Sequence, residues 1–258
     1  MLFINTRPQD RASTLTEALV DAGYQVATLP LLELTAVPFS IELQQLYQQL
    51  EQTQVIVVVS PTAVEVGMRY LQQANIDLVQ LTHIQWIAVG QATAQALAKF
   101  KIESLVPKVE SSEGMLDLPI LKQQDQLKQI AFWRGLGGRQ FMMQQLQQQG
   151  VSVLNFVLYR RQCPELSVLK IPTILKNIES HQQVAVLISS EASWNNWQQL
   201  TSQNQVEAEW IYLTLGERLT QLLTHSQALL NQASNIIQLE KLSASEIIHR
   251  MRCWQGKV

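Results

Sequence analysis

The two halves of this chain carry the same landmarks in the same order, and this internal repeat limits the possible folds more than any other feature. The matched pairs are Arg7 and Arg134 (offset 127), Gly23 and Gly150 (127), Ser60 and Ser189 (129), Gly90 and Gly216 (126), and Glu113 and Glu246 (133). Because the spacing is nearly constant, we predict two tandem copies of one structural unit. Two copies imply two lobes with a cleft.

Within each copy, short apolar segments alternate with amphipathic segments. Val55 to Val59 and Trp86 to Val89 are continuous apolar runs of strand length, whereas Leu15 and Leu19 belong to a helical pattern that ends at Gly23. Parallel neighbouring strands need crossover connections, and helices then cover both faces of the sheet. The pattern therefore predicts an α/β fold with parallel sheets.

The strand-to-helix turns are the expected ligand sites, because ligands of such sheets bind outside the carboxyl ends of the strands. Helix N-termini and loop N–H groups converge there. Seven residues fall at these turns: Arg7, Ser60, Gly90, Ser112, Arg134, Ser189 and Gly216. If the two lobes face each other, all seven line one cavity.

The stretch from Gln129 to Gln162 concentrates the features of an anion site. It contains a buried strand from Ile130 to Trp133, a glycine-rich turn with Arg134 and Arg139, an amphipathic helix and a second extended run. Exposed backbone N–H groups and a helix N-terminus favour anions. The turn is not a dinucleotide fingerprint, because GLGG lacks the GxGxxG spacing. We predict that it binds an anionic small molecule.

Composition restricts the class of partner. The chain has 258 residues and a net charge of −2, which gives no general attraction for nucleic acid or an anionic membrane. No export signal or apolar run of membrane-spanning length is predicted, and the two cysteines, Cys163 and Cys253, fit a reducing compartment. We expect a cytoplasmic protein. The scattered histidines form no ligand pattern, so we predict no metal site.

Several segments, taken in order, resemble one known family. They are Thr6-Arg7-Pro8, VVVSPTAV, AVGQATAQAL, VPKVESSEGMLDL from Val106 to Leu118, WRGLGGR, VLYRR and VLISSEAS. Each segment alone is degenerate, but their order and spacing resemble uroporphyrinogen-III synthase over essentially the whole chain.

The resemblance implies two flavodoxin-like domains joined by two antiparallel linker strands. Residues 1–34 with 164–258 would form one discontinuous domain, and residues 35–163 would form the other. The linker strands would lie at about 29–38 and 157–164, where the chain carries proline-bearing extended runs.

The resemblance also implies a reaction. The linear tetrapyrrole hydroxymethylbilane is closed into uroporphyrinogen III, with inversion of the last pyrrole ring, loss of water and no cofactor. This substrate is a flexible polycarboxylate, so its enzyme needs donors that hold carboxylates and a confined site that sets the attacking geometry. We expect a monomer that acts on this small molecule.

Tyr159 resembles the family tyrosine that is proposed to assist departure of the hydroxyl. A phenol, with a pKa near ~10, is a weak general acid at neutral pH, so its expected role is hydrogen-bond polarisation. The alternative is a tyrosine that only packs in the hinge strand.

The expected substrate-binding residues are arginines that can grip carboxylates, glycines that allow close approach, and hydroxyl residues at helix starts. They are Arg7, Arg134, Arg139 and Arg218, then Gly90, Gly135, Gly138 and Gly216, and finally Ser60, Thr62, Ser112, Ser189 and Ser190. The alternative for each arginine is an ion pair, and for each hydroxyl a structural helix cap. Arg160 and Arg161 alternate faces of a strand, and we include neither.

Two turns depart from the family pattern. The third position of the turn after Val59 is usually asparagine in the family, whereas this chain has Thr62. The turn Gly216-Glu217-Arg218-Leu219 lacks two hydroxyl residues that the resemblance leads us to expect. We expect Glu217 to face solvent and Arg218 to serve as a replacement carboxylate donor.

Two other classes of function fit a two-lobed α/β chain. A nucleotide-sugar transferase would need its base and phosphate sites in one lobe, which the near-equal repeat disfavours. A non-enzymatic small-anion-binding protein is usually exported or fused to a DNA-binding module, and neither feature is visible.

Overall fold

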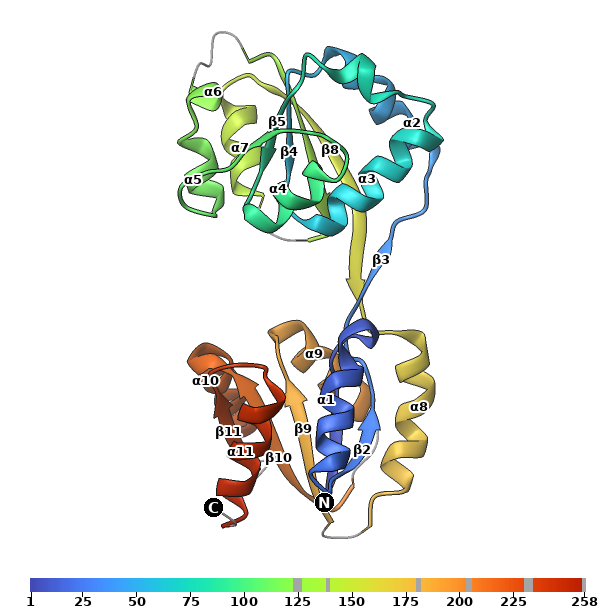
Figure 1. Ribbon diagram of the computed structural model, residues 1–258, viewed down its shortest axis with the longest axis vertical. Coiled ribbons are helices and arrows are strands. Elements are labelled where there is room, and N and C mark those ends of the chain that lie inside the picture. The colour runs from blue at the N-terminus through green and yellow to red at the C-terminus, as the bar shows by residue number, and fades with distance from the viewer. Residues whose placement is uncertain (123–126, 138–139, 180–181, 203–205, 230–233, 257–258) are drawn as a thin grey trace. The chain divides into compact units, whose positions relative to one another are not determined.

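The computed structural model describes residues 1–122, 127–137, 140–179, 182–202, 206–229 and 234–256. The chain divides into two compact units, which we call unit 1 (Met1–Glu33 with Gln162–Val258) and unit 2 (Leu34–Arg161). Each unit is a central sheet covered by helices (Figure 1). The expected domain boundaries, after residues 34 and 163, lie within two residues of these divisions.

The sheet of unit 1 is parallel, and its strands lie in the order β2-β1-β9-β10-β11. Numbered by their order along the chain, these strands follow the arrangement 2-1-3-4-5 of flavodoxin-type sheets. Their bounds are Leu2–Asn5 (β1), Gln25–Thr28 (β2), Gln182–Ile188 (β9), Ala208–Leu215 (β10) and Asn235–Leu239 (β11).

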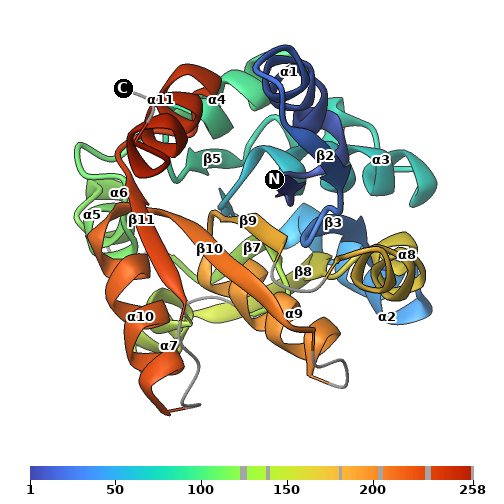
Figure 2. The same ribbon diagram turned by 90° about the horizontal axis from the view of Figure 1, so that it is seen from below.

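Helices cover both faces of this sheet, because alternate strand residues point to opposite sides. Phe3 packs in the core beneath α1 and α11, whereas Ile4 packs in the core beneath α8, α9 and α10. Figure 2 shows the two groups of helices on either side of the strands. Their bounds are Gln9–Asp21 (α1), Glu165–Lys176 (α8), Glu191–Thr201 (α9), Gly216–Leu229 (α10) and Ala244–Trp254 (α11).

The sheet of unit 2 has the order β3-β8-β7-β4-β5-β6, and its strands from β8 to β6 are parallel. β3 runs antiparallel to β8, because Val37 N–H donates to the Leu158 carbonyl while Gln162 and Glu33 are bonded at the other end. The bounds are Glu33–Ala36 (β3), Val55–Val58 (β4), Gln85–Ala88 (β5), Ser104–Leu105 (β6), Gln129–Gly135 (β7) and Ser152–Gln162 (β8).

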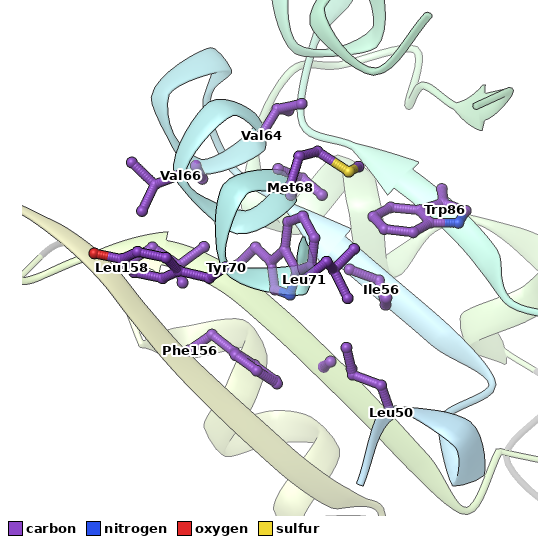
Figure 3. Close-up of a cluster of buried hydrophobic side chains, with 14 of the residues drawn as sticks. Leu50, Ile56, Val64, Val66, Met68, Tyr70, Leu71, Trp86, Phe156 and Leu158 are labelled. Atoms are coloured by element: carbon purple, nitrogen blue, oxygen red, sulfur yellow. The ribbon is translucent and has the colours of Figure 1, made fainter. Parts of the chain in front are cut away.

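Helices also cover both faces of the second sheet. One face packs under α2, α3 and α4, where Val64, Met68 and Leu71 of α3 share a core with Ile56 and Trp86 of the strands (Figure 3). The other face packs under α5, α6 and α7. The bounds are Ile41–Gln48 (α2), Pro61–Gln73 (α3), Gln91–Ala98 (α4), Ser112–Leu116 (α5), Pro119–Lys122 (α6) and Phe141–Gln148 (α7), with short 3-10 helices at Leu50–Gln52 and Leu78–Leu81.

These sheets confirm the predicted parallel α/β class, and they show how the internal repeat is used. β7 and β8 correspond to β1 and β2, and β4, β5 and β6 correspond to β9, β10 and β11, so the five parallel strands have the same spatial order in both units. Each unit therefore combines the first part of one copy with the second part of the other. Gly23 and Gly150, with φ of +87° and +85°, end equivalent helices.

Three of the landmark pairs are not structural equivalents. Ser60 caps α3, and the corresponding cap of α9 is Ser190 rather than Ser189. The backbones of Gly90 and Gly216 differ, with φ of −165° and +75°. The third pair is Glu113 and Glu246. The caps that precede these glutamates are Ser111 and Ser243, an offset of 132 (243 minus 111), so the glutamates are out of register by one residue.

Among the described residues, the structure has no helix with the length and hydropathy of a bilayer-spanning segment.

Candidate active site

The candidate site lies where β7 and β8 reach the carboxyl edge of the unit 2 sheet. The pairing is regular up to Arg134 with Val157 and then shifts, so that Gly135 pairs with Tyr159. Leu158 is the additional residue of this β-bulge, and bulges re-aim the side chains that follow them. Both Leu158 and Tyr159 belong to the core beneath α3.

Tyr159 is held in one orientation by groups from two other elements. Tyr159 is 3% exposed, and its hydroxyl oxygen lies 2.9 Å from Oγ of Ser60, the residue that caps the N-terminus of α3. Ser60 Oγ also accepts the N–H of Ala63 at 3.1 Å. The phenol ring lies against Gly135, where a Cβ atom would be only 2.6 Å from the ring carbons.

A cavity of about 200 Å³ opens beside Tyr159, and the described residues that line it belong to unit 2. Pockets for drug-sized ligands have volumes of roughly 300–1,000 Å³. This cavity therefore suits a single small ring with its substituents. Its lining residues are Val59, Val89, Met115, Phe132, Arg134, Gly135, Gly137, Met142, Met143, Tyr159 and Arg161.

Arg134 brings a buried positive charge to this cavity. Its side chain is 5% exposed, its guanidinium donates to the Gly137 carbonyl, and Nη1 lies 3.8 Å from Sδ of Met143. Burial lowers the pKa of the Arg134 guanidinium, and the nearby phenol of Tyr159 acts in the opposite direction. Arginine nevertheless stays protonated in proteins. Arg134 thus organises the glycine-rich loop and carries a positive charge.

Arg161 lines the same cavity, although we did not predict it as a site residue. It follows Tyr159 by two positions, and residues two apart in a strand point to the same face. This alternation could have identified Arg161 once Tyr159 was placed in the site.

Comparison with known proteins identifies the family. A family model described as Uroporphyrinogen-III synthase HemD matches residues 13–227. The chain belongs to the uroporphyrinogen-III synthase family. A relative named uroporphyrinogen-III synthase, from Proteus mirabilis, is 30% identical over 166 residues, which are 62% of this chain and 80% of the relative. Enzymes of this family cyclise hydroxymethylbilane in heme biosynthesis.

Solved structures support the same fold. A mutant uroporphyrinogen III synthase from the bacterium Thermus thermophilus matches with a TM-score of 0.58 and 15% identity, over 99% of this chain and 98% of that one. Uroporphyrinogen-III synthetase from Helicobacter pylori matches with a TM-score of 0.56 and 13% identity, over the same shares of the two chains. At such identities the likeness establishes the fold alone.

One helix start that we predicted to bind the synthase substrate already holds a carboxylate of the chain. Gly90 precedes α4, and the N–H of Gln91 donates to Oε1 of Glu110 at 2.9 Å. A Cβ atom at Gly90 would lie 2.3 Å from Oε2 of Glu110. No residue pattern indicates this contact, because Glu110 lies in a turn 19 residues further along the chain.

The other predicted residues of unit 2 lie at helix starts or outside the described residues. Thr62 is the second residue of α3 and is partly buried. Ser112 is the first residue of α5, but the hydroxyl that caps this helix belongs to Ser111 and accepts Gly114 N–H at 3.1 Å. The capping alternative for Ser112 is therefore excluded, and its substrate contact stays a prediction. Gly138 and Arg139 lie outside the described residues.

The predicted residues of unit 1 follow the carboxyl ends of β1, β9 and β10, at the same edge of its sheet. Arg7 Nη1 donates to the Leu242 carbonyl at 3.4 Å. Ser189 and the α9 cap Ser190 follow β9, and Gly216 follows β10.

Arg218, in the first turn of α10, is exposed and paired with Glu191 at 3.0 Å. Such exposed pairs contribute little to stability, so Arg218 can exchange partners at low cost. Glu217 is exposed, as expected.

In the part of the chain that the structure describes, no group of three or more histidine, cysteine, aspartate or glutamate side chains could hold a metal ion.

Proposed function

We propose that this chain closes hydroxymethylbilane into uroporphyrinogen III at the unit 2 cavity, with Tyr159 donating a hydrogen bond to the hydroxyl that departs. The observation that carries this proposal is the bonded pair of Ser60 and Tyr159, with a separation of 2.9 Å, at the wall of a cavity that suits one pyrrole ring. The family match favours this function over a nucleotide-sugar transferase or an anion sensor.

The contacts of Ser60 support a direction for the hydrogen bonds. Ser60 Oγ accepts the N–H of Ala63, and the proton of its own hydroxyl can be donated to the oxygen of Tyr159. The phenol proton of Tyr159 is then directed to a ligand. A hydroxyl that donates to the departing oxygen polarises the C–O bond without having to transfer its proton fully.

The apolar lining supports a confining role. Phe132, Met142 and Met143 present ring and thioether surface to the ligand, and Arg134 supplies a charge at the same wall. When a pyrrole ring is bound there, the apolar walls keep water away from its reactive carbon once the hydroxyl has left. Confinement of the rest of the chain then favours attack by the inverted ring, and such positioning is worth several orders of magnitude in rate.

The remaining carboxylates of the substrate need further donors. Arg7, Arg218 and the N-terminus of α9 behind Ser190, which all belong to unit 1, stay predicted carboxylate-binding groups, because they offer guanidinium and backbone N–H donors. Helix N-termini and arginines are the usual protein partners of carboxylates. The N-terminus of α3, which carries Ser60 and Thr62, supplies equivalent groups in unit 2.

Replacement of Tyr159 tests the proposal. Tyr159→Phe should lower kcat on the order of 100-fold, the loss typical for one donor in a preorganised site. Tyr47→Phe is the matched control, because it removes a buried phenol hydroxyl that donates to the Gly67 carbonyl at 3.1 Å elsewhere in unit 2. Unchanged turnover in Tyr159→Phe would leave Tyr159 with a packing role only.

We also propose that the enzyme is a cytoplasmic monomer. Both cysteines, Cys163 and Cys253, are free, which fits a reducing compartment. Light scattering of the purified chain should give a mass near 29.3 kDa. A mass twice as large would contradict the monomer.

A further inference from the structure

Among the described residues, Arg134 and Arg161 line the unit 2 cavity, and they differ in their surroundings. Arg134 is buried and donates to the Gly137 carbonyl. Arg161 is exposed, and within the described part of the chain its side chain has neither a hydrogen bond nor an ion pair. Its five N–H donors are therefore available to a ligand.

The strand geometry places Arg161 at the mouth of the cavity. Pairing between β7 and β8 ends at Gly135 with Tyr159, and Arg161 follows two residues later. It lies past the carboxyl edge of β7 while sharing a strand face with Tyr159. Arg160 occupies the alternate position of the same strand, is also exposed, and so offers a matched comparison.

We propose that Arg161 is a substrate-binding residue that grips a carboxylate arm of the pyrrole ring held in this cavity. The inference rests on the proposed function and extends it to a residue of the site. A ring can occupy the cavity that Phe132 and Met143 help to line, but a carboxylate arm cannot follow it into apolar surroundings without a large desolvation cost. The arm must stay at the mouth, and the guanidinium there can hold it through two parallel hydrogen bonds.

Solvent exposure makes Arg161 suited to this role. The charge pair forms at the edge of the cavity, where desolvation of the guanidinium and the carboxylate costs less than it would deep inside. Lysine would supply the charge but not the planar fork that matches a carboxylate. The geometry therefore assigns loop organisation to Arg134 and substrate capture to Arg161.

The test compares Arg161→Gln with Arg160→Gln in the full chain, with hydroxymethylbilane as substrate. Arg161→Gln should raise KM on the order of tenfold, because the glutamine amide can keep one neutral hydrogen bond but loses the charge and the second bond, and it should leave kcat nearly unchanged. Arg161→Lys should recover part of this loss. Arg160→Gln should keep the wild-type KM, and the KM of Arg161→Gln should respond less to salt than that of the wild type.

A KM of Arg161→Gln equal to that of the wild type, or an equal rise in both glutamine variants, would overturn the role of Arg161. Equilibrium binding of uroporphyrin III, a stable oxidised form of the product, provides a second measurement: Arg161→Gln should bind it about tenfold more weakly. If Arg161→Gln unfolds early, Arg161→Lys decides, because a wild-type affinity for that porphyrin in the lysine variant contradicts capture through the planar fork.

Wild type and Tyr159→Phe are assayed in parallel. If Tyr159→Phe loses turnover while Arg161→Gln keeps the wild-type KM, only the substrate-binding role of Arg161 is contradicted. Failure of the wild type to form isomer III removes the proposed function itself.

Discussion

At the level of single residues, the orientation of Tyr159 depends on the absence of a side chain at position 135. A Cβ atom there would lie 2.6 Å from the Tyr159 ring, which is buried and cannot move aside freely. Gly135 thus contributes to the site through its close approach to Tyr159 as well as by lining the cavity. The glycine-rich turn predicted an anion loop, but this packing against a residue of the next strand could be seen only in the structure.

Gly135→Ala should lower both turnover and stability. The added methyl must displace the Tyr159 ring from Ser60, and overpacking of this kind costs about 1–3 kcal/mol of unfolding free energy. Gly150→Ala is the control, since that glycine has a φ of +85° with open space around it, and its substitution costs about 1 kcal/mol through backbone strain. Normal turnover in Gly135→Ala, measured beside urea unfolding of both variants, would show that Tyr159 orientation is unimportant.

Glu110 occupies the backbone N–H at the start of α4, a turn that we predicted to bind the substrate. If a substrate carboxylate binds at the start of α4, Glu110 must leave Gln91 first, and its charge opposes the arrival of the substrate. Glu110→Ala should therefore lower KM several-fold.

Glu103→Gln is the control for loss of one exposed negative charge, because Glu103 precedes the amino end of β6. A KM that stays constant or rises in Glu110→Ala would show that the substrate does not use this helix start.

At the level of elements, the start of α3 combines a structural and a chemical role in one hydroxyl. Ser60 caps the helix through Ala63 and also bonds to Tyr159. Ser40 caps α2 by accepting Leu43 N–H at 3.3 Å. A comparison of the two caps thus separates the contribution of Ser60 to helix stability from its contribution to the site.

Ser60→Ala and Ser40→Ala should each lower the unfolding free energy by about 1 kcal/mol. Only Ser60→Ala should also lower kcat, because only Tyr159 loses a partner that orients its proton. Thermal unfolding and steady-state kinetics of the two variants measure these effects. Equal turnover in both variants would argue against the hydrogen-bond direction proposed for Ser60 and Tyr159.

Much of the element order could be predicted from the sequence, whereas register could not. Runs such as Val55 to Val59 are too apolar for a half-exposed sheet, and helix stops such as Gly23 have a positive φ that glycine tolerates. The bulge at Leu158 and the contact of Glu110 with α4 depend on pairing and on distant loops. Local residue patterns carry no signal for such features. Arg161 was missed although its spacing of two residues from Tyr159 indicates a shared strand face.

At the level of the whole molecule, the internal repeat explains why two units of the same strand order arise from one chain. Unit 1 takes β1 and β2 from the first copy and β9, β10 and β11 from the second. Unit 2 takes β7 and β8 from the second copy and β4, β5 and β6 from the first. Strand ends with polar and basic residues therefore occur in both units, as Arg7 and Arg134 show. This duplication suits a substrate with carboxylates on every ring.

The chain is expected to form uroporphyrinogen III rather than merely to bind a polycarboxylate. The most direct test gives purified protein hydroxymethylbilane, oxidises the products and resolves the porphyrin isomers. We predict predominantly isomer III, because confinement favours attack by the inverted last ring on the carbon that has lost its hydroxyl. Formation of isomer I alone, which arises spontaneously without inversion, would contradict the assignment.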